Sequence, residues 1–485
     1  MQQRSLARNG IYKAILNIFN LLIPLIVTPY ITGLLEPNLY GAYNRIFSEF
    51  NIFLTLGTFG IYNYGVREIS KVRDNPIEKS KLFSSLFSIG IISNFIMTFI
   101  YVLFFTFRAN KPIEVYLYLV MIIQIVGNIF YIEFVNEANE DYGFITKKTI
   151  IVRIIYLVSI FVFVRKPSDI LPYSIIISST ILINNLASYF HIKKHISFNF
   201  QHLQIVRHLY PLIVTLLLSN VEILYTQLDK IMLSPFINDI AVTEYVLPTS
   251  LVGTIAAVPL ALINVAIPRL SSFIGQGNKS EYTRVLNKTI NNYMLMVIPM
   301  GFGMAALAQE IMQFFSKGVY ANAFPVLIVS GMARVVFGYQ SIIMNLIMYI
   351  NSLEKQLTTL MLVFGIVNLG FNFGLVGLGL FSPFTALVTT VIAVLLFVIV
   401  GYIYTRKKLQ LNYKLLSKEI IGYIVVSLTF FPISWVIRGL SLGLWPTIII
   451  VMIICSGIYG LYLLVTKDTF VLDILNKVKL KLKRD

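Results

Sequence analysis

Long apolar segments separated by short polar connections recur along the whole chain. About fourteen of them reach the roughly 20 residues that a helix needs to cross a bilayer. Because backbone groups in lipid must be hydrogen-bonded within the segment, each is predicted to be a membrane-spanning helix. The predicted spans are 13–33, 44–64, 83–107, 115–135, 149–165, 170–190, 209–236, 245–267, 290–314, 324–349, 357–376, 380–404, 420–438 and 443–466.

Several predicted spans also carry polar residues at helical spacing. In the first, Lys13, Asn17, Asn20 and Pro24 follow one another at intervals of 4, 3 and 4 residues, which places them on one helix face. Similar stripes run through the second, seventh and tenth spans. Polar side chains are costly in hydrocarbon unless they face the bundle interior or a water-filled cavity. The stripes therefore predict a polar interior.

The charge of the chain is basic, with 39 Lys and Arg against 22 Asp and Glu. Thirty of these cations lie at the termini and on alternate connections, seven lie on the opposite connections, and two lie within predicted helices. The positive-inside rule then places both termini in the cytoplasm. Since the cations are scattered over short segments, no basic domain for nucleic acid is present and we predict no nucleic-acid partner.

A weak internal repeat divides the chain. The interval from Tyr43 to Arg67 equals that from Tyr245 to Arg269, 24 positions, at an offset of 202. An even number of helices separates the copies, which predicts a parallel repeat about an axis along the membrane normal, with a cavity between the halves. The alternative is that any two helix units of this orientation share such an outline. The predicted parts are residues 1–207, 208–408 and 409–485, which hold helices 1–6, helices 7–12, and helices 13–14 with a basic tail.

Charged residues near the ends of the predicted helices have two open interpretations. Arg45 and Glu49 are one turn apart, so they either neutralise each other or serve cargo and a coupling ion. Asp229 and Lys230 lie toward the outer end of their span, where long side chains reach the interface at low cost.

Glu222 and Arg334 lie deeper in their spans, where a purely structural role is harder to justify. A transport or coupling role and a structural role are therefore both open for these two residues. Guanidinium and ammonium groups pair with phosphate, so the cations within the helices suit an anionic cargo.

No nucleotide-binding signature accompanies these residues. The run 275–280 lacks the spacing of a phosphate-binding loop, and the His191 and His195 pair has no adjacent carboxylate or cysteine in the sequence. We predict no cofactor and no metal site. Any uphill transport would then draw on a proton or sodium gradient, or on consumption of the cargo.

Three short segments carry a resemblance to a known family. They are NYGVREISK at 63–71, LDKIM at 228–232 and PRLS at 268–271. Together with the fourteen-helix, two-lobe plan they resemble the Wzx-type flippases of bacterial polysaccharide synthesis. That family belongs to the MOP superfamily, with the lipid II flippase and the MATE multidrug exporters. The resemblance covers essentially the whole chain and rests on the order and spacing of the motifs.

The resemblance implies a MATE-like, all-α polytopic membrane protein that is a transporter and not an enzyme. It implies that undecaprenyl-diphosphate-linked oligosaccharide repeat units are flipped from the inner to the outer leaflet of the bacterial cytoplasmic membrane. Alternating access would proceed through a central, partly cationic cavity and would supply capsule, O-antigen or another surface polysaccharide. Membrane lipids and a polysaccharide polymerase are the further expected partners.

The resemblance also implies roles for individual residues. The cations expected at the diphosphate are Arg45, Lys230 and Arg334. The residues expected at the sugars are Asn17, Asn20 and Tyr62. The carboxylates expected to carry a coupling proton or sodium ion are Glu222, Glu49 and Asp229.

Three other classes of membrane protein are less consistent with the sequence. A MATE-like exporter of organic cations needs acidic residues deep in the first lobe, and the first span has none before Glu36. A glycosyltransferase or polymerase needs a large outer loop, and every outer connection here is short. A major facilitator needs a characteristic basic loop that residues 66–81 do not supply.

Overall fold

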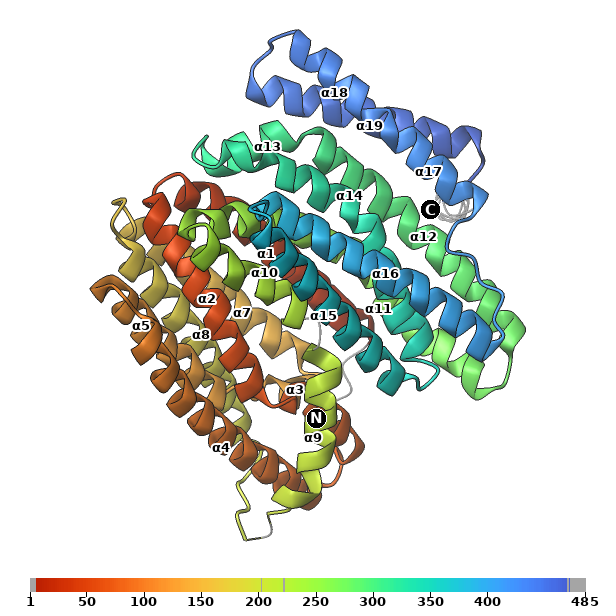
Figure 1. Cartoon of the computed structure of the whole chain (residues 1–485). Coiled ribbons are helices and arrows are strands. Elements are labelled where there is room, and N and C mark those ends of the chain that lie inside the picture. The colour runs from red at the N-terminus through yellow and green to blue at the C-terminus, as the bar shows by residue number, and fades with distance from the viewer. Residues whose placement is uncertain (1–5, 202, 221–222, 469–470, 472–485) are drawn as a thin grey trace, which may run out of the picture. The chain divides into compact units, whose positions relative to one another are not determined.

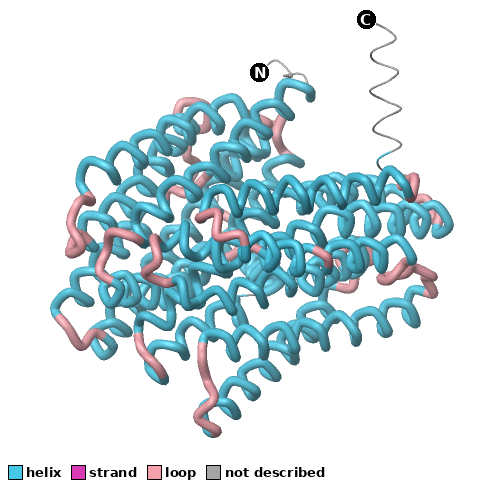
Figure 2. The backbone as a smooth tube through the Cα atoms, turned by 90° about the horizontal axis from the view of Figure 1, so that it is seen from above, coloured by secondary structure: helices cyan, strands magenta, loops and turns pink. Residues whose placement is uncertain are grey.

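A computed structural model describes residues 6–201, 203–220, 223–468 and 471. Across these residues the chain forms helices and loops, with no strand (Figure 2). The predicted all-α class is therefore confirmed.

The chain divides into two compact units, residues 1–243 and 244–485. Figure 1 labels the helices that begin in the first unit, with the exception of α6 (Glu133–Ala138). They are α1 (Leu6–Thr32), α2 (Pro37–Thr58), α3 (Ile61–Lys71), α4 (Pro76–Arg108), α5 (Pro112–Ile129), α6 (Glu133–Ala138), α7 (Tyr142–Phe163), α8 (Ile170–Lys193), α9 (Ile205–Asn220), α10 (Ile223–Phe236) and α11 (Asp239–Gly275). The boundary between the units falls within α11.

In the first unit α2 is the central helix. It packs against α4, α5 and α10, α5 packs against α8, and α7 lies between α1 and α8. The core beside α2 is aromatic: the rings of Phe50, Tyr101 and Phe105 meet edge to face at 5.6 Å between centroids. Aromatic pairs of this geometry contribute beyond the apolar area that they bury. This packing fixes α2 against α4 and α5.

The second predicted span is not one helix. The span 44–64 is interrupted after Thr58, where Phe59 and Gly60 adopt φ angles of 50° and 70°, and the chain restarts as α3. The left-handed region ends a helix because it breaks the run of backbone hydrogen bonds. Arg67, expected to close the second helix, therefore belongs to the separate helix α3, which packs on α6 and α9.

Short polar sequences set where several helices begin. Asn75 precedes Pro76, and its side chain accepts hydrogen bonds from the backbone N–H groups of Ile77 and Glu78 at the start of α4. Proline at the first helical position removes a donor that would have no partner there. A capping box of Ser382 and Thr385 starts α16 (Pro383–Leu409) in the same way.

The outer faces of the long helices are apolar and exposed. On α4, Phe95, Phe99 and Phe107 are 63–85% exposed, while Phe83 and Leu86 on the same helix are buried. A 33-residue helix with one aromatic face uncovered is typical of a helix that packs on its bundle and faces lipid. The predicted membrane location accounts for this exposed surface.

Among the residues that the structure describes, ten helices are long and apolar enough to cross a membrane, or eleven if the bent pair α12 (Lys279–Ala306) and α13 (Ala308–Ser316) forms one span. Over their described residues, all fourteen predicted segments fall on helices. The three that do not meet this test of length and hydropathy fall on α2, α7, and the pair α9 and α10.

The second unit contains the rest of α11 and the C-terminal helices. They are α12 (Lys279–Ala306), α13 (Ala308–Ser316), α14 (Phe324–Ser341), α15 (Glu354–Gly377), α16 (Pro383–Leu409), α17 (Lys418–Leu428), α18 (Phe430–Gly439) and α19 (Leu444–Val465), with a 3₁₀ turn η1 (Ala321–Ala323) and a π-helix η2 (Ile342–Met348). α12 packs along α14, α14 along α16, and α17 and α18 along α12 (Figure 1).

Two contacts organise this unit. α12 and α14 cross at Gly301 and Gly331, where a Cβ on Gly301 would lie 2.3 Å from the Gly331 carbonyl oxygen. Small residues allow helix backbones to approach this closely in membrane proteins. Near the bend of 71° between α12 and α13, Arg438 of α18 forms a bidentate pair with Glu310, at 2.6 and 2.9 Å. This ion pair thus joins α18, and with it the C-terminal helices, to α13.

Candidate functional site

A buried charge cluster lies where α2, α5 and the start of α11 meet in the first unit. The Arg45 guanidinium donates to Glu114 at 2.8 Å and to Asp239 at 2.8 Å, and its side chain is only 4% exposed. Glu49 lies 3.9 Å from Arg45, which is longer than either of these contacts. The contact of Arg45 with Glu49 is therefore weaker than its contacts with Glu114 and Asp239. The main partners come from other helices.

Glu49 has close partners of its own. Arg108, at the end of α4, donates to it at 3.1 Å, and the Tyr118 hydroxyl donates to its other oxygen. The cluster thus contains two guanidinium groups and three carboxylates within one buried network, which leaves one carboxylate more than cations. Groups in such a network stabilise the fold only while every member has a partner.

Close backbone packing brings Asp239 to the cluster. Gly41 of α2 lies against the first turn of α11, where a Cβ would sit 2.3 Å from the Asp239 carbonyl oxygen. Three residues further along α2, the Asn44 amide donates to the Thr243 hydroxyl at 2.9 Å. Ser234 of α10 donates to the Asp239 carboxylate at 2.6 Å. The sequence folds this way because a glycine leaves room for the approach.

A cavity of about 360 Å³ opens among α2, α5, α7 and α8, within the first unit, and both apolar and polar residues line it. Its size lies within the range of small-molecule sites. Four amide side chains line it: Gln124, Asn128, Asn184 and Asn185. Three threonines, Tyr131 and one cation, Arg153, complete the polar lining, and no acidic residue is among the described residues that form it.

Hydrogen bonds to neighbouring helices orient the amides. Asn185 donates to the Gly127 carbonyl at 3.0 Å, and Gln124 donates to the Ser178 hydroxyl at 3.0 Å. Asn184 makes a contact of 3.5 Å to Asn185, and its buried carbonyl oxygen has no hydrogen-bond partner among the described residues. A buried acceptor without a partner is unfavourable, so it suits a site that receives a donor from a ligand.

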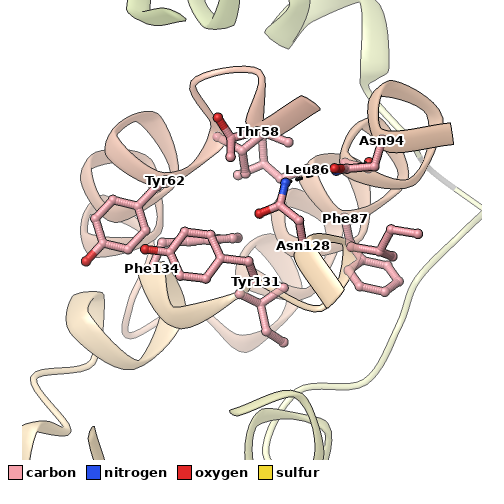
Figure 3. Close-up of a pocket in the computed structure, with 12 residues that line it drawn as sticks. Thr58, Tyr62, Leu86, Phe87, Asn94, Asn128, Tyr131 and Phe134 are labelled. Atoms are coloured by element: carbon pink, nitrogen blue, oxygen red, sulfur yellow. Dashed lines mark hydrogen bonds between the residues drawn. The ribbon is translucent and has the colours of Figure 1, made fainter. Parts of the chain in front are cut away.

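A smaller cavity of about 20 Å³ adjoins this one and shares Thr58, Asn128 and Tyr131 with it (Figure 3). The Asn128 amide donates to Asn94 at 2.8 Å, across the small cavity. Tyr62, predicted to contact sugar, stacks on Tyr131 with centroids 5.4 Å apart and an interplanar angle of 8°. The structure thus places one predicted site residue directly behind the wall of the larger cavity.

A second buried ion pair lies at the junction of α6, α7 and α8. Lys148 donates to Glu133 at 2.8 Å and to Ser188 at 2.7 Å, and its side chain is 4% exposed. Lys148 is one of the thirty cations that the sequence assigns to the cytoplasmic side. In the structure α7 begins at Tyr142, so Lys148 lies within a helix and its side chain is buried.

The remaining predicted residues lie apart from these clusters. Asn17 and Asn20 are exposed on α1, and Asn20 accepts a contact of 3.5 Å from Arg153. Lys230, on α10, is half-buried and donates to Gln227 at 3.4 Å.

Three other predicted residues complete the set. Asp229 is fully buried beside Lys230 in the sequence, and Glu222 lies outside the described residues. Arg334, in the second unit, is half-buried with its guanidinium 4.8 Å from the Phe337 ring centroid.

Sequence reasoning missed Glu114, Asp239 and the cavity amides. Glu114 and Asp239 look like ordinary acidic residues in the first turns of helices, and only the fold reveals their shared partner. The amides did leave a signal: Gln124 and Asn128 are one turn apart within an otherwise apolar span. Adjacent Asn184 and Asn185 interrupt another such span. Polar pairs in apolar segments mark a polar interior.

No group of three or more His, Cys, Asp or Glu is placed to hold a metal ion in the part of the chain that the structure describes. His191 lies 3.1 Å from Asp141, a carboxylate that sequence proximity did not reveal. This pair alone is too few ligands for a structural metal site.

Comparison with known proteins identifies the family. Residues 6–274, more than half of the chain, match the family described as polysaccharide biosynthesis protein. A protein named as an O-antigen transporter of Escherichia coli (strain K12) is 27% identical over 183 residues, which are 37% of this chain and 43% of that relative's length.

Solved structures show the fold. The lipid II flippase MurJ in an inward closed conformation matches with a TM-score of 0.65 at 15% identity, covering 97% of this chain and 100% of that one. An inward-facing multidrug resistance MATE family transporter of the MOP superfamily matches with a TM-score of 0.60 at 12% identity, covering 81% and 98%. These relatives are transporters and flippases and not enzymes, as the sequence predicted. The resemblance to Wzx-type flippases is confirmed, and the chain belongs to the polysaccharide biosynthesis protein family.

Proposed function

We propose that this protein flips undecaprenyl-diphosphate-linked oligosaccharide repeat units from the inner to the outer leaflet of the bacterial cytoplasmic membrane. A sugar chain and a diphosphate lose their hydration in hydrocarbon, so the head group needs an enclosed polar path. The polyprenyl tail remains in lipid. The flipped unit would then supply a polysaccharide polymerase.

The observation that carries this proposal is the combination of family and fold in one chain. The polysaccharide family match covers residues 6–274, and the lipid II flippase fold extends over 97% of the chain. One of these relatives is named for lipid II and the other for O-antigen. A lipid-linked oligosaccharide as the cargo is consistent with both names.

The finer architecture is part of the proposal. Fourteen spans would form two six-helix lobes, residues 1–207 and 208–408, related by a parallel two-fold repeat, with 409–485 appended. The three spans α2, α7 and α9 with α10 would cross the membrane despite their polar residues, because those residues face the bundle interior. The imbalance of thirty cations against seven supports cytoplasmic termini.

We propose alternating access as the mechanism, with Lys230 and Arg334 as partners of the diphosphate. Arg45 would join them only when its pairs with Glu114 and Asp239 open, since its guanidinium is engaged with both in this structure. Asn17, Asn20 and Tyr62 would contact sugar. The exposure of Asn17 and Asn20 on α1 supports their access to a ligand.

A coupling proton or sodium ion would be carried by Glu222, Glu49 or Asp229. Among these, Glu49 lies in the buried network with Arg108 and Tyr118, where a change of protonation would disturb three helices together. Burial of Asp229 supports a role in which its charge is neutralised by an ion or a partner.

The test is depletion of the protein in its host. We expect lipid-linked repeat units to accumulate at the cytoplasmic face while surface polysaccharide disappears, and a plasmid copy should reverse both effects. Protease-accessible surface glycan and radiolabelled lipid extracts measure the two quantities. Normal surface glycan together with altered drug efflux would instead support a MATE-like exporter of organic cations. The acid-free lining of the 360 Å³ cavity argues against that alternative, since a cation site needs carboxylates or an aromatic cage.

A further inference from the structure

We propose that the cavity among α2, α5, α7 and α8 is a binding site for one sugar ring of the cargo, held by Asn184 and its neighbouring amides. This inference rests on the proposed function for its ligand class. It goes beyond the predicted sites, because none of the cavity amides was among them.

The chemistry of the lining selects a ligand with many hydroxyl groups. An amide side chain offers both donors and acceptors, so several amides in one cavity can hydrogen-bond a sugar from different sides. Three of the four amides already use an N–H group to fix their orientation: Gln124 to Ser178, Asn185 to Gly127 and Asn128 to Asn94. Their orientation is therefore set before a ligand arrives, which lowers the entropic cost of binding.

Asn184 is the residue of the described lining whose buried side-chain oxygen lacks a hydrogen-bond donor and can accept one from a ligand. Its carbonyl oxygen is buried and has no partner among the described residues, while its amide group makes only the 3.5 Å contact to Asn185. This oxygen is closed to solvent in this structure, and a sugar hydroxyl can donate to it once the Asn184 side chain turns toward the cavity, which breaks only the 3.5 Å contact to Asn185. A cation without N–H or O–H groups would leave the oxygen without a hydrogen bond, and the cavity has no carboxylate to hold it.

An aromatic face completes the site. Tyr131 lines the cavity, and Tyr62 stacks behind it at 5.4 Å, so the ring is supported in its orientation. The apolar C–H face of a pyranose packs against such a ring, while its hydroxyl groups point to the amides. Arg153 at the side of α7 supplies the single positive charge and favours neutral or acidic sugars over amino sugars.

Asn184→Leu in the purified full-length protein tests the inference. The probes are undecaprenyl diphosphate, which has no sugar, and the repeat-unit oligosaccharide released from the host's own surface polysaccharide by acid hydrolysis. Binding of each is measured by thermophoresis in nanodiscs. We expect about tenfold weaker oligosaccharide binding, which corresponds to one lost hydrogen bond, and unchanged binding of undecaprenyl diphosphate.

Gln313→Leu is the matched control, because it makes the same amide-to-leucine change at an exposed position of α13 in the second unit. It should bind both probes as the wild type does. Asn184→Ala guards against misfolding of the leucine variant, and it should show the same selective loss. The inference is overturned if the wild type does not bind the oligosaccharide, or if either Asn184 variant retains full affinity. The depletion experiment decides the flippase function separately, so the two failures are distinguishable.

Discussion

The Arg45 guanidinium of α2 lies 2.8 Å from the carboxylate of Asp239, the first residue of α11, although 194 residues separate them in the chain. Glu114 of α5 occupies another donor of the same guanidinium. The Arg45 side chain thus connects α2, α5 and the start of α11, in surroundings from which water is largely excluded.

Removal of this cation should destabilise the first unit. Arg45→Met leaves the buried Glu114 and the partly buried Asp239 without their cationic partner, and we expect a loss of about 3 kcal/mol in the free energy of unfolding. Circular dichroism during heating in detergent measures it. Arg284→Met is the control, since Arg284 pairs with Glu281 on an exposed face and should change stability by less than about 0.5 kcal/mol. Equal melting of the two variants would contradict a structural role for Arg45.

Gly41→Ala should also destabilise the protein, because the new methyl group would lie 2.3 Å from the Asp239 carbonyl oxygen. We expect a net loss of about 1–3 kcal/mol, even though alanine favours the helical state by about 1 kcal/mol. Gly303→Ala makes the same change within α12, where no atom lies within 4 Å of the new Cβ. The control should be neutral or more stable. Thermal denaturation of the two variants side by side measures the difference, and no loss at Gly41 would show that the helices are not in close contact.

The pair between Arg438 and Glu310 can be tested through the one cysteine of the chain. Cys455 is buried on α19, so a thiol-reactive fluorophore reports the opening of the C-terminal helices. Arg438→Lys replaces a bidentate contact with a point charge, and we expect labelling at a lower temperature, equivalent to about 2 kcal/mol. Lys317→Arg, at an exposed position, is the control for charge-conserving changes and should label as the wild type does. Unchanged labelling in Arg438→Lys would exclude the pair as an anchor.

We expect polysaccharide export to depend on Arg334 and Glu222, two charged residues that lie within predicted helices. We expect Arg334→Ala and Glu222→Gln to abolish surface polysaccharide without lowering the amount of protein in the membrane, since each would act on cargo or ion and not on folding. Immunoblots and surface-glycan staining measure the two quantities. Arg284→Ala, on an exposed helix face, should leave export intact. Normal export by either variant would remove that residue from the site.

The hydrophobic pattern was sufficient to predict the helices, because a span in lipid must satisfy its own backbone. Over its described residues, every predicted segment falls on one or two helices, and the polar stripe of the second segment does lead to the buried cluster at Arg45. The break at Phe59 was not predictable from periodicity, since apolar residues continue through it and only the backbone angles reveal it.

The sequence also could not predict which residues contact one another in the charge cluster. Glu114 and Asp239 meet at Arg45 from 69 and 194 residues away, and local spacing carries no information on such pairs. The burial of Lys148 was not predictable either, because α7 begins seven residues before the predicted span 149–165. The amides of the cavity did leave a local signal in the sequence, because they form polar pairs within apolar spans. Residue type alone, however, did not show that these pairs line a ligand site.

The long sequence separation between Arg45 and Asp239 has a consequence for biosynthesis. At about 5–20 residues per second, Asp239 leaves the ribosome roughly 10–40 s after Arg45, and Glu114 roughly 3–14 s after it. During that interval Arg45 enters the bilayer at a cost of about 3 kcal/mol with only Glu49, one turn away, as a local counter-charge. Glu49, the acidic residue of the same helix, is therefore the counter-charge available to Arg45 until Glu114 and Asp239 have been synthesised.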